Sequence, residues 1–465
     1  MNHTHKPTMT ILEKIAAVKR LEIAALYARY DLADLKRRVT PAPVLLRDTM
    51  QQRRPFFIAE FKRKSPSEGW INQFADVEKQ VLRYRDAGAG AVSVLTDTPH
   101  FGGSYDDLTV TSRALAGSGV LVLQKDFVLD PIQIYLARLH GADLILLIAA
   151  LLDPEKLENL RQTALSLGMD ALVEVHDAEE YQKIRHLPFP VLGVNNRDLH
   201  TFRTALNRVN TLAGLVRADG RLLVSESGIR NSADFQVVRG VSDGFLIGTG
   251  LMREAVVQPF FQHFAAGGKY LFKACGLRET TPVEADYLGY NFSKHSKRRV
   301  DENVLKNLKL PTNAVAVFYK NDANEIRDTL AKYPFSTVQL YADDVTPEFV
   351  RSLHTRVVMA LPVLATTDLE KLEPFAPDVD LFILDGAVPG SGQSIETTIP
   401  TDFPYPFLLA GGLNVDNLDA VLLYKNCIGV DVASGIETDG VVDARKMLEV
   451  KQGLLEMNEH TAVMR

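Results

Sequence analysis

The chain has 465 residues, which is long for one ordinary core and comfortable for two domains. Its 46% hydrophobic and 24% charged residues are typical of a soluble globular protein. The net charge of −6, with both signs mixed along the chain, gives no indication of a nucleic-acid surface, and no apolar run reaches the length of a membrane span. The two cysteines, Cys275 and Cys427, are too few for a disulfide framework, so we expect a cytoplasmic protein.

The first half of the chain repeats a strand-and-helix pattern. Residues 10–38 are predicted to form a helix, because Ile11, Ile15 and Val18 recur at helical spacing. Eight short apolar runs follow at intervals of roughly 20 to 30 residues, which suit a strand and a returning helix. Eight such units predict a closed parallel barrel. The runs are residues 56–61, 91–96, 120–125, 144–149, 171–175, 191–195, 222–225 and 244–248.

The pattern starts again after a stretch of small residues at 265–269, which is the best candidate for a linker. We therefore predict two tandem (β/α)8 TIM barrels, over residues 1–266 and 267–465, of which the first has an extra N-terminal helix. One doubly wound domain is the alternative, but it does not naturally use sixteen such units. The further runs are residues 270–275, 287–292, 314–319, 337–341, 357–361, 381–385, 407–411 and 429–433.

Several strands of the first predicted barrel end in charged or amide residues. Glu60 and Lys62 are two apart, so a strand points both to one face, at the end where parallel barrels bind ligands. For this pair alone, a surface salt bridge is an equally good reading. Because charged residues recur at other strand ends, we expect a ring of polar groups around one mouth. Burying so many charges costs free energy unless they are paired, which indicates a functional site. Its other members are Lys125, Glu174, Asn195, Arg197 and Glu226.

Two later strand ends carry small residues instead. Ser227 and Gly228 follow the seventh run, and Gly248 and Thr249 lie at the end of the eighth. Small residues leave backbone N–H groups accessible, and in this architecture a phosphate commonly binds at these two strands. Either pair alone is compatible with a plain turn, but both together predict a phosphorylated substrate.

Together these segments closely resemble indole-3-glycerol-phosphate synthase, across the whole first half. Gln124 stands where many relatives have Cys and is expected to point away from the mouth. The resemblance implies ring closure of 1-(2-carboxyphenylamino)-1-deoxyribulose 5-phosphate to indole-3-glycerol phosphate, with loss of CO₂ and water. The matching motifs are Glu60-x-Lys62-x-x-Ser65-Pro66-Ser67, Lys125-Asp126-Phe127, Leu172-Val173-Glu174-Val175, Asn195-Asn196-Arg197-Asp198-Leu199 and Ser225-Glu226-Ser227-Gly228-Ile229.

The resemblance implies a role for each polar strand end. Lys125 is expected to protonate the ketone oxygen, while Lys62 holds the substrate carboxylate and assists at the ketone. Glu174 is expected to accept the proton that leaves during dehydration. Which lysine is the main donor at each step stays open, and a Schiff base on Lys125, which borohydride would trap, is a competing role. Groups expected to orient the lysines or bind the substrate are Glu60, Glu226, Asn195, Arg197 and Ser65.

The strand ends of the second predicted barrel carry fewer charges. Cys275 precedes a glycine and lies near Lys273, a setting expected to lower its pKa, although a free cysteine is more often a buried apolar residue. Asp385 ends an apolar run and is expected at the mouth. Cys427 precedes the eighth run and is read as structural. Exposed backbone suited to a phosphate is expected at Gly411, Gly412, Ser434 and Gly435.

This half resembles phosphoribosylanthranilate isomerase over nearly its whole length. The resemblance implies an Amadori rearrangement of N-(5′-phosphoribosyl)anthranilate. Asp385 is expected to protonate the furanose ring oxygen, and the Cys275 thiolate to take the C2′ proton. The matching segments are Lys273-x-Cys275-Gly276-Leu277, Val338-Gln339-Leu340, Leu384-Asp385, Gly390-Ser391-Gly392, Leu409-Ala410-Gly411-Gly412-Leu413 and Gly429-Val430-Asp431-x-x-Ser434-Gly435-Ile436-Glu437.

Three positions of this half depart from the family pattern. Lys297 stands where the family usually has Pro, and the role of binding the anthranilate carboxylate is carried to Arg298, with Arg299 as a possible substitute. Tyr341 stands where His is frequent, and Gly386 where Asn is common. These departures concern contacts to the substrate and leave the acid and the base in place.

The isomerase product is the synthase substrate, so the two halves predict consecutive steps of tryptophan biosynthesis at two separate sites. We expect small phosphorylated anthranilate-sugar substrates, no cofactor or metal, no nucleic-acid or membrane partner, and a monomer. One alternative is synthase activity only, with the second barrel a phosphate-binding or scaffold module. The presence of both Cys275 and Asp385 argues against it, since a retired site need keep neither. Another is a different sugar-phosphate barrel enzyme, such as an aldolase.

Overall fold

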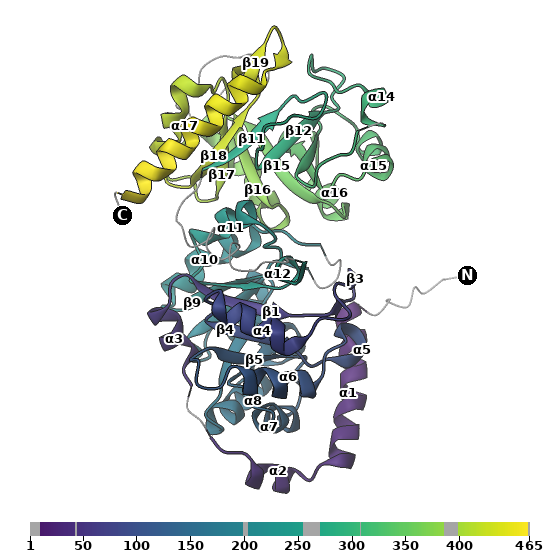
Figure 1. Ribbon diagram of the computed structural model, residues 1–465, viewed down its shortest axis with the longest axis vertical. Helices are drawn as coiled ribbons and strands as arrows, with labels where there is room; N and C mark the ends of the chain where they lie inside the picture. Colours follow the sequence, from purple (N-terminus) through teal and green to yellow (C-terminus); the bar gives the residue numbers. More distant parts are fainter. Residues whose placement is uncertain are drawn as a thin grey trace, which may run out of the picture. The chain divides into compact units, whose positions relative to one another are not determined.

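Two closed barrels of parallel strands make up the protein (Figure 1). The chain divides into two compact units, and each contains one eight-stranded barrel with helices outside it. The prediction of two tandem (β/α)8 barrels is therefore confirmed. The expected linker at 265–269 lies outside the described residues. The computed structural model describes residues 10–41, 44–198, 203–253, 270–306, 308–385 and 399–463.

The first barrel has the strand order β1-β10-β9-β8-β7-β6-β5-β4, and β1 closes it by pairing with both β10 and β4. All six residues of β1 are buried, as expected for strands with a core inside and helices outside. A two-stranded hairpin, β2 (Lys64–Ser65) and β3 (Gly69–Trp70), follows β1. The barrel strands are β1 (Phe56–Phe61), β4 (Ala91–Leu95), β5 (Leu121–Lys125), β6 (Leu144–Ile148), β7 (Asp170–Val175), β8 (Val191–Asn195), β9 (Leu222–Glu226) and β10 (Gly244–Ile247).

Helices alternate with these strands along the chain. Most begin at a residue whose side chain accepts a backbone N–H, such as Asp76 before α4 and Asp153 before α8. They are α3 (Leu46–Gln52), α4 (Val77–Asp86), α5 (Thr98–Phe101), α6 (Tyr105–Ala114), α7 (Pro131–Leu139), η1 (Ala149–Leu151), α8 (Pro154–Ser166), α9 (Ala178–Ile184), α10 (Arg208–Ala218), α11 (Ser232–Arg239) and α12 (Thr249–Arg253).

The N-terminal helix is shorter than predicted. Helix α1 (Ile11–Arg29) starts with a capping box formed by Thr10 and Glu13, and it ends at Tyr30, which is extended. The carboxylate of Asp31 then caps a second helix, α2 (Leu32–Arg38). Both helices pack on α7. Their apolar residues therefore follow one periodic pattern, which does not reveal that the helix is interrupted at Tyr30 and Asp31. The cap residue Asp31 is the signal that periodicity alone misses.

The second barrel has the order β11 to β18, closed by the pairing of β11 with β18. Several of its connecting elements in the described residues are 3-10 helices; the longest contains Pro374 and Pro377, which lack the N–H of an α-helical bond. The strands are β11 (Leu271–Cys275), β12 (Tyr287–Asn291), β13 (Ala314–Val317), β14 (Thr337–Tyr341), β15 (Arg356–Pro362), β16 (Leu381–Asp385), β17 (Phe407–Ala410) and β18 (Cys427–Val432). The other elements are α14 (Glu302–Leu305), α15 (Ala323–Lys332), η2 (Ala342–Asp344), α16 (Pro347–Ser352), η3 (Thr366–Asp378), η4 (Val415–Leu423), η5 (Ser434–Ile436), β19 (Glu437–Thr438), β20 (Val441–Val442) and α17 (Ala444–Val463).

The strands end where the sequence places the candidate site residues. Five of these residues are each the last residue of a strand, and Glu60 and Glu174 are each the last but one. Since all strands of a barrel run the same way, these residues gather at one mouth in each barrel. The five are Lys125, Asn195, Glu226, Cys275 and Asp385.

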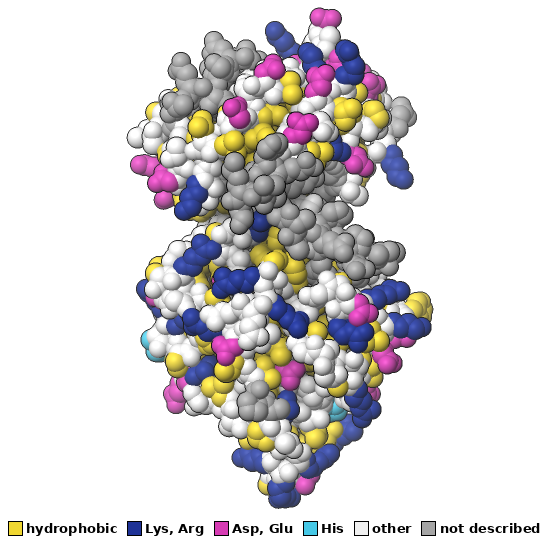
Figure 2. Space-filling view, turned by 60° about the vertical axis from the view of Figure 1, so that its left-hand side comes forward, with side chains coloured by type: hydrophobic (Ala, Val, Ile, Leu, Met, Phe, Trp, Pro, Cys, Tyr) yellow, Lys and Arg dark blue, Asp and Glu magenta, His cyan; other side chains and the backbone are white. Residues whose placement is uncertain are grey.

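The surface drawn in Figure 2 mixes basic, acidic, apolar and neutral side chains. Over the described ranges, no helix is both long enough and apolar enough to cross a membrane.

Candidate active sites

Lys125 lies between two carboxylates in the mouth of the first barrel. Its Nζ is 2.5 Å from Glu226 Oε2 and 3.2 Å from Glu174 Oε2. Asn195 donates a hydrogen bond of 3.1 Å from Nδ2 to the other oxygen of Glu174. Glu226 is fully buried and Glu174 nearly so. A buried charge is tolerated when it is paired and hydrogen-bonded. Lys125 and both oxygens of Glu174 meet this condition, whereas Glu226 Oε1 has no hydrogen-bond partner among the described residues.

Glu60 and Lys62 form a second pair at the same mouth. Glu60 Oε1 lies 2.5 Å from Lys62 Nζ, and the Glu60 residue is only 4% exposed, which excludes the reading as a surface salt bridge. Arg197 donates to the hydroxyl of Ser67 at 3.2 Å, and Ser65 Oγ lies 3.4 Å from that same hydroxyl. The expected ring of groups is therefore brought together, as two lysine–carboxylate clusters with Arg197 beside the loop after β1.

Two of the carboxylates, Glu226 and Glu60, occupy space that is open only because a neighbouring residue is glycine. A Cβ atom at Gly193 would collide with Glu226 Oε1, and one at Gly248 would collide with Glu60 Oε1. Gly193 lies on β8 directly beside Glu174 of β7. Gly248 was predicted as part of a phosphate site; what the structure shows is that its missing Cβ makes room for the Glu60 carboxylate. Gly193 was not singled out from the sequence, because the requirement for glycine there comes from Glu226 on the neighbouring strand β9.

The charges of the cluster move the pKa values of its members in different directions. Burial opposes the charge on Lys125, but the carboxylates, with Glu226 the strongest, outweigh it and raise the pKa of Lys125. Burial raises the pKa of Glu226 to about 8; Lys125 opposes this rise and Glu174 adds to it. Burial also opposes the charge on Glu174, yet Lys125 and His176 lower the pKa of that carboxyl. The three groups titrate together, so these pKa values belong to the cluster, and the pKa values of its two carboxyls move in opposite directions.

His176 is a member of this site that sequence reasoning missed. Its Nε2 lies 3.5 Å from Glu174 Oε1, and its Nδ1 lies 3.1 Å from Glu180 Oε2. The residue follows Glu174 by two positions at a strand end, and that spacing is the signal that could have placed both on one face.

The predicted phosphate residues of the first barrel lie in a turn after β9 and at the start of α12. Ser227 and Gly228 have φ values of 64° and 89°, and Asn196 holds this turn by donating to the carbonyl of Ser227 at 3.2 Å. The hydroxyl of Thr249 lies 3.5 Å from the carboxylate of Glu68. An acidic neighbour of Thr249 was not expected from the sequence.

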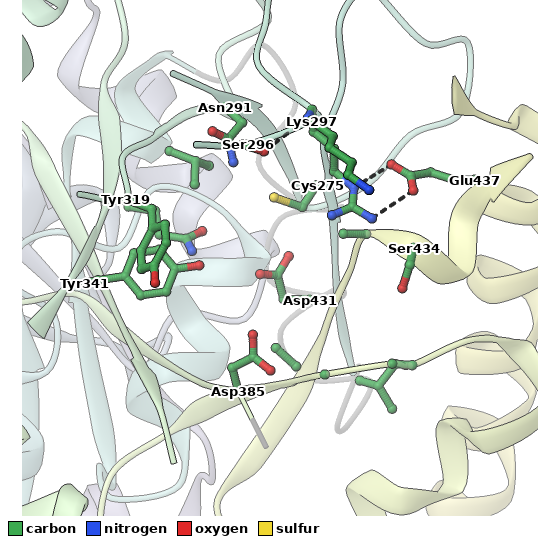
Figure 3. A pocket seen from close by; sticks show the side chains of 18 of the residues that line it. Cys275, Asn291, Ser296, Lys297, Tyr319, Tyr341, Asp385, Asp431, Ser434 and Glu437 are labelled. Atoms are coloured by element: carbon green, nitrogen blue, oxygen red, sulfur yellow. Dashed lines mark hydrogen bonds and ion pairs between the residues drawn. The ribbon is translucent and has the colours of Figure 1, made fainter. Parts of the chain in front are cut away.

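The second barrel encloses a cavity of about 460 Å³ at its mouth (Figure 3). Cys275 and Asp385 both line it, from strands β11 and β16, so the predicted base and acid share one cavity. Gln339, Tyr319 and Asp431 line it as well and carry no role in the sequence prediction.

The environment of Cys275 differs from the prediction. Lys273 is fully buried, with its Nζ 2.8 Å from Asp431 Oδ1, and it hydrogen-bonds Cys275. Burial nevertheless outweighs Lys273, so the pKa of the Cys275 thiol is raised, and the expected lowering is wrong. Asp431 adds to the rise because its negative charge disfavours a thiolate. The pKa of Cys427 is raised to about 12 by burial, and that cysteine begins β18, consistent with a structural role.

Arg298 lies at the edge of the cavity in a bidentate ion pair. Its Nε and Nη2 are 2.5 and 2.8 Å from the two carboxylate oxygens of Glu437. The backbone of Gly276 leaves room for the Arg298 side chain, since a Cβ there would meet Arg298 Cδ at 2.7 Å. Arg299 instead lies 3.9 Å from Glu302. Of the two arginines, Arg298 is the one that lines the cavity.

The departures from the family pattern fall in different places. Lys297 and Tyr341 both line the cavity, and the ring of Tyr341 packs edge-on against Tyr319 with centroids 4.8 Å apart. Gly386 and the segment 390–392 lie outside the described residues.

The predicted phosphate residues of this barrel lie beside the same cavity. Gly411 and Gly412 have φ values of 104° and 64°, which favour glycine, and both line the cavity together with Ser434. Gly435 lets its backbone approach the carbonyl of Leu413, because a Cβ would collide there. Among the described residues, no group of three or more His, Cys, Asp or Glu is arranged to hold a metal ion.

These two mouths, one with paired buried charges and the other with a thiol and a carboxyl group lining one cavity, are typical of a two-barrel enzyme. Residues 12–264 match the family described as indole-3-glycerol phosphate synthase, and residues 273–453 match N-(5'phosphoribosyl)anthranilate (PRA) isomerase. The chain belongs to the family of bifunctional tryptophan biosynthesis proteins that join these two domains. It is accordingly an enzyme with a lyase and an isomerase domain.

Curated relatives are similar over nearly the whole chain. The "Tryptophan biosynthesis protein TrpCF" of Salmonella typhi is 32% identical over 96% of this chain and 99% of its own length. The protein of that name from Helicobacter pylori strain J99 is 30% identical, with the same coverage. The "Multifunctional tryptophan biosynthesis protein" of Schizosaccharomyces pombe is 32% identical over 94% of this chain, which spans 65% of that longer protein.

Gly193→Ala should impair the first site while leaving the fold intact. The new methyl group would displace the flexible end of Glu226 and turn it away from Lys125. We expect ring-closure kcat to fall by about tenfold or more, because catalytic groups act only in a narrow range of geometry. Steady-state assays of both activities would measure this, with isomerisation unchanged. Gly214→Ala, at an open helical position, is the matched control; equal activity of both variants would contradict the account.

Glu226→Gln should remove a pH dependence of stability from the first barrel. Folded Glu226 keeps its proton up to about pH 8, whereas an unfolded glutamate loses it near pH 4.5. The stabilisation from this proton is complete below about pH 4.5 and is lost as the pH rises to about 8, by at most ~1.4 kcal/mol per pH unit. The free energy of unfolding of the wild type minus that of the variant should therefore fall across this window.

The single tryptophan, Trp70, makes this measurement specific to the first barrel. Its fluorescence in urea titrations at several pH values reports the unfolding of that barrel. A difference between wild type and variant that stays constant with pH would contradict the raised pKa of Glu226.

Proposed function

We propose that the first barrel closes the indole ring of 1-(2-carboxyphenylamino)-1-deoxyribulose 5-phosphate. The observation that carries this proposal is the position of Lys125 between Glu174 and Glu226 at the mouth. The aromatic carbon that carries the carboxylate attacks the ketone, and Lys125 gives its proton to the developing oxyanion. Loss of CO₂ restores the aromatic ring. The new hydroxyl then takes a second proton from one of the two site lysines and leaves as water, while Glu174 accepts a proton from the new ring, which yields indole-3-glycerol phosphate.

The charge state of Lys125 supports the acid role over a Schiff base. A Schiff base requires a neutral amine, whereas the surrounding carboxylates raise the pKa of Lys125 and keep it an ammonium. Lys62 is paired with Glu60, and Arg197 lies near the loop after β1. We assign Lys62 and Arg197 to the substrate carboxylate. Groups assigned to the sugar hydroxyls, the phosphate or the orientation of the lysines are Glu60, Ser65, Asn195, Glu226, Ser227, Gly228, Gly248 and Thr249.

In the second barrel we assign the general acid to Asp385 and the general base to Cys275. Both line one cavity, which supports action on opposite sides of one sugar. Asp385 protonates the ring oxygen of N-(5′-phosphoribosyl)anthranilate, and the resulting imine loses its C2′ proton to Cys275. Because the pKa of Cys275 is raised, the thiolate depends on buried Lys273 for stabilisation. Arg298 is assigned to the anthranilate carboxylate, and the phosphate to Gly411, Gly412, Ser434 and Gly435.

Further assignments concern the chain as a whole. We propose a domain boundary at residues 266 and 267, which agrees with family matches at 12–264 and 273–453. We also propose a monomer in the cytoplasm, where the free thiols Cys275 and Cys427 stay reduced. No cofactor is assigned, because the acid–base chemistry of both reactions requires none.

Two substitutions should separate the two activities. Cys275→Ala removes the base and should lower isomerisation by at least about a hundredfold, and Lys125→Ala should do the same to ring closure. Each variant should keep the other activity, because the groups belong to different barrels. Separate steady-state assays with each purified substrate provide the measurement. Isomerisation that survives Cys275→Ala would contradict the mechanism given for the second barrel.

A further inference from the structure

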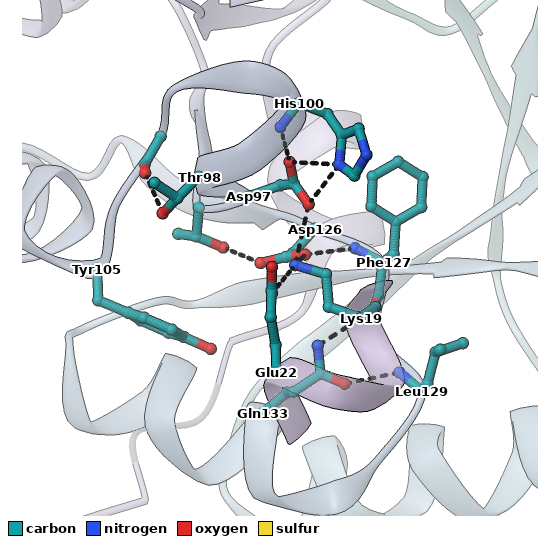
Figure 4. Close-up of polar contacts among 12 residues, drawn as sticks. Lys19, Glu22, Asp97, Thr98, His100, Tyr105, Asp126, Phe127, Leu129 and Gln133 are labelled. Atoms are coloured by element: carbon teal, nitrogen blue, oxygen red, sulfur yellow. Dashed lines mark hydrogen bonds and ion pairs between the residues drawn. The ribbon is translucent and has the colours of Figure 1, made fainter. Parts of the chain in front are cut away.

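Helix α1 carries a lysine that is buried among carboxylates. Lys19 is 2% exposed, and its Nζ lies 2.8 Å from Asp126 Oδ1 and 3.0 Å from Asp97 Oδ2 (Figure 4). Its third partner is Glu22 on the same helix, at 2.6 Å. Asp97 and Asp126 follow β4 and β5, so the lysine joins the helix to two neighbouring strand ends on the side of the barrel mouth.

Asp126 connects this cluster to the site, because it directly follows Lys125 in the chain. Its Oδ2 accepts a 2.5 Å hydrogen bond from the hydroxyl of Thr96. The backbone N–H of Thr96 donates to the carbonyl of Lys125 at 3.1 Å. The exit of β5 is thus held on one side by Thr96 and on the other by Lys19.

The pairing is ionic despite the burial. Burial opposes the charge of Lys19, but Asp126 and Asp97 outweigh it and raise the pKa of that lysine. Burial opposes the charge of Asp97 too, and Lys19 outweighs it and lowers the pKa of Asp97. Apolar packing could attach the helix without charges, since Leu12 and Ile15 already pack in one cluster with Phe127. Buried ion pairs often add little net stability but fix a geometry.

We propose that Lys19 is a positioning residue of the ring-closing site. By holding Asp126 and Asp97 together, it fixes the exit of β5 and thereby the place of Lys125 Nζ between Glu174 and Glu226. The inference rests on the proposed role of Lys125 and adds a residue from outside the barrel. A displacement of a catalytic group by about 1 Å can cost about a hundredfold in rate, so the anchor affects turnover more than substrate binding.

The test compares Lys19→Met with Lys14→Met in the full-length chain. Lys14 lies on the same helix and is exposed, so its substitution is chemically matched and removes no buried ion pair. Lys19→Met should lower ring-closure kcat by about ten- to a hundredfold with KM changed by less than about threefold. Isomerisation by the same molecules should be unchanged, and Lys14→Met should match the wild type in both activities.

Two further variants, Asp126→Asn and the double variant Lys19→Met/Asp126→Asn, keep the test informative if Lys19→Met alone misfolds. Lys19→Met leaves two carboxylates buried without their partner, whereas Asp126→Asn removes one of those charges. Asp126→Asn should show the same loss of kcat, and the double variant should be no slower than the slower single variant, since both break one contact. Trp70 fluorescence during thermal unfolding shows at which temperatures the first barrel of each variant is folded.

A solely structural role for Lys19 would overturn the proposal. In that case the melting temperature of the first barrel would fall, while kcat measured below it would stay within about twofold of wild type in all variants. Additive losses of kcat in the double variant would also contradict it. Failure of the proposed function itself is distinguishable, because it would appear as retained ring closure in Lys125→Ala.

Discussion

The pairing of Lys125 with Glu174 and Glu226 is the interaction on which the first site depends. Closing eight parallel strands into a barrel brings the ends of β5, β7 and β9 to one mouth, away from bulk water. Carboxylates buried there need a cation, and an ammonium buried there needs carboxylates. The group is therefore stable only as a set, and small residues such as Gly193 and the external anchor Lys19 serve to keep that set in place.

The second barrel solves a different chemical problem with the same architecture. In the reaction proposed for it, one acid and one base replace the oxyanion stabiliser, and Asp385 and Cys275 both line the cavity at its mouth. Charge is again balanced locally, by Lys273 with Asp431 and by Arg298 with Glu437. The two barrels thus share strand order and glycine turns at the ends of their last strands, and we attribute the difference in reaction to a few strand-end residues.

Much of this organisation was predictable from the sequence, because strand ends are local features. An apolar run that ends in a charged residue identifies both the strand and its outward end, as Lys125, Glu226 and Asp385 illustrate. What could not be predicted depends on contacts between distant segments. The raised pKa of Cys275 arises from burial by the closed barrel, and the anchoring role of Lys19 arises from two loops far from it in sequence.

The central claim is that each barrel forms a complete active site by itself. An equimolar mixture of Cys275→Ala and Lys125→Ala chains, supplied with N-(5′-phosphoribosyl)anthranilate, tests it most directly. The account predicts that the mixture forms indole-3-glycerol phosphate, with the ketose intermediate released by one chain and consumed by the other, while neither variant alone does so. A mixture in which the intermediate accumulates without ring closure, or never forms, would contradict the claim.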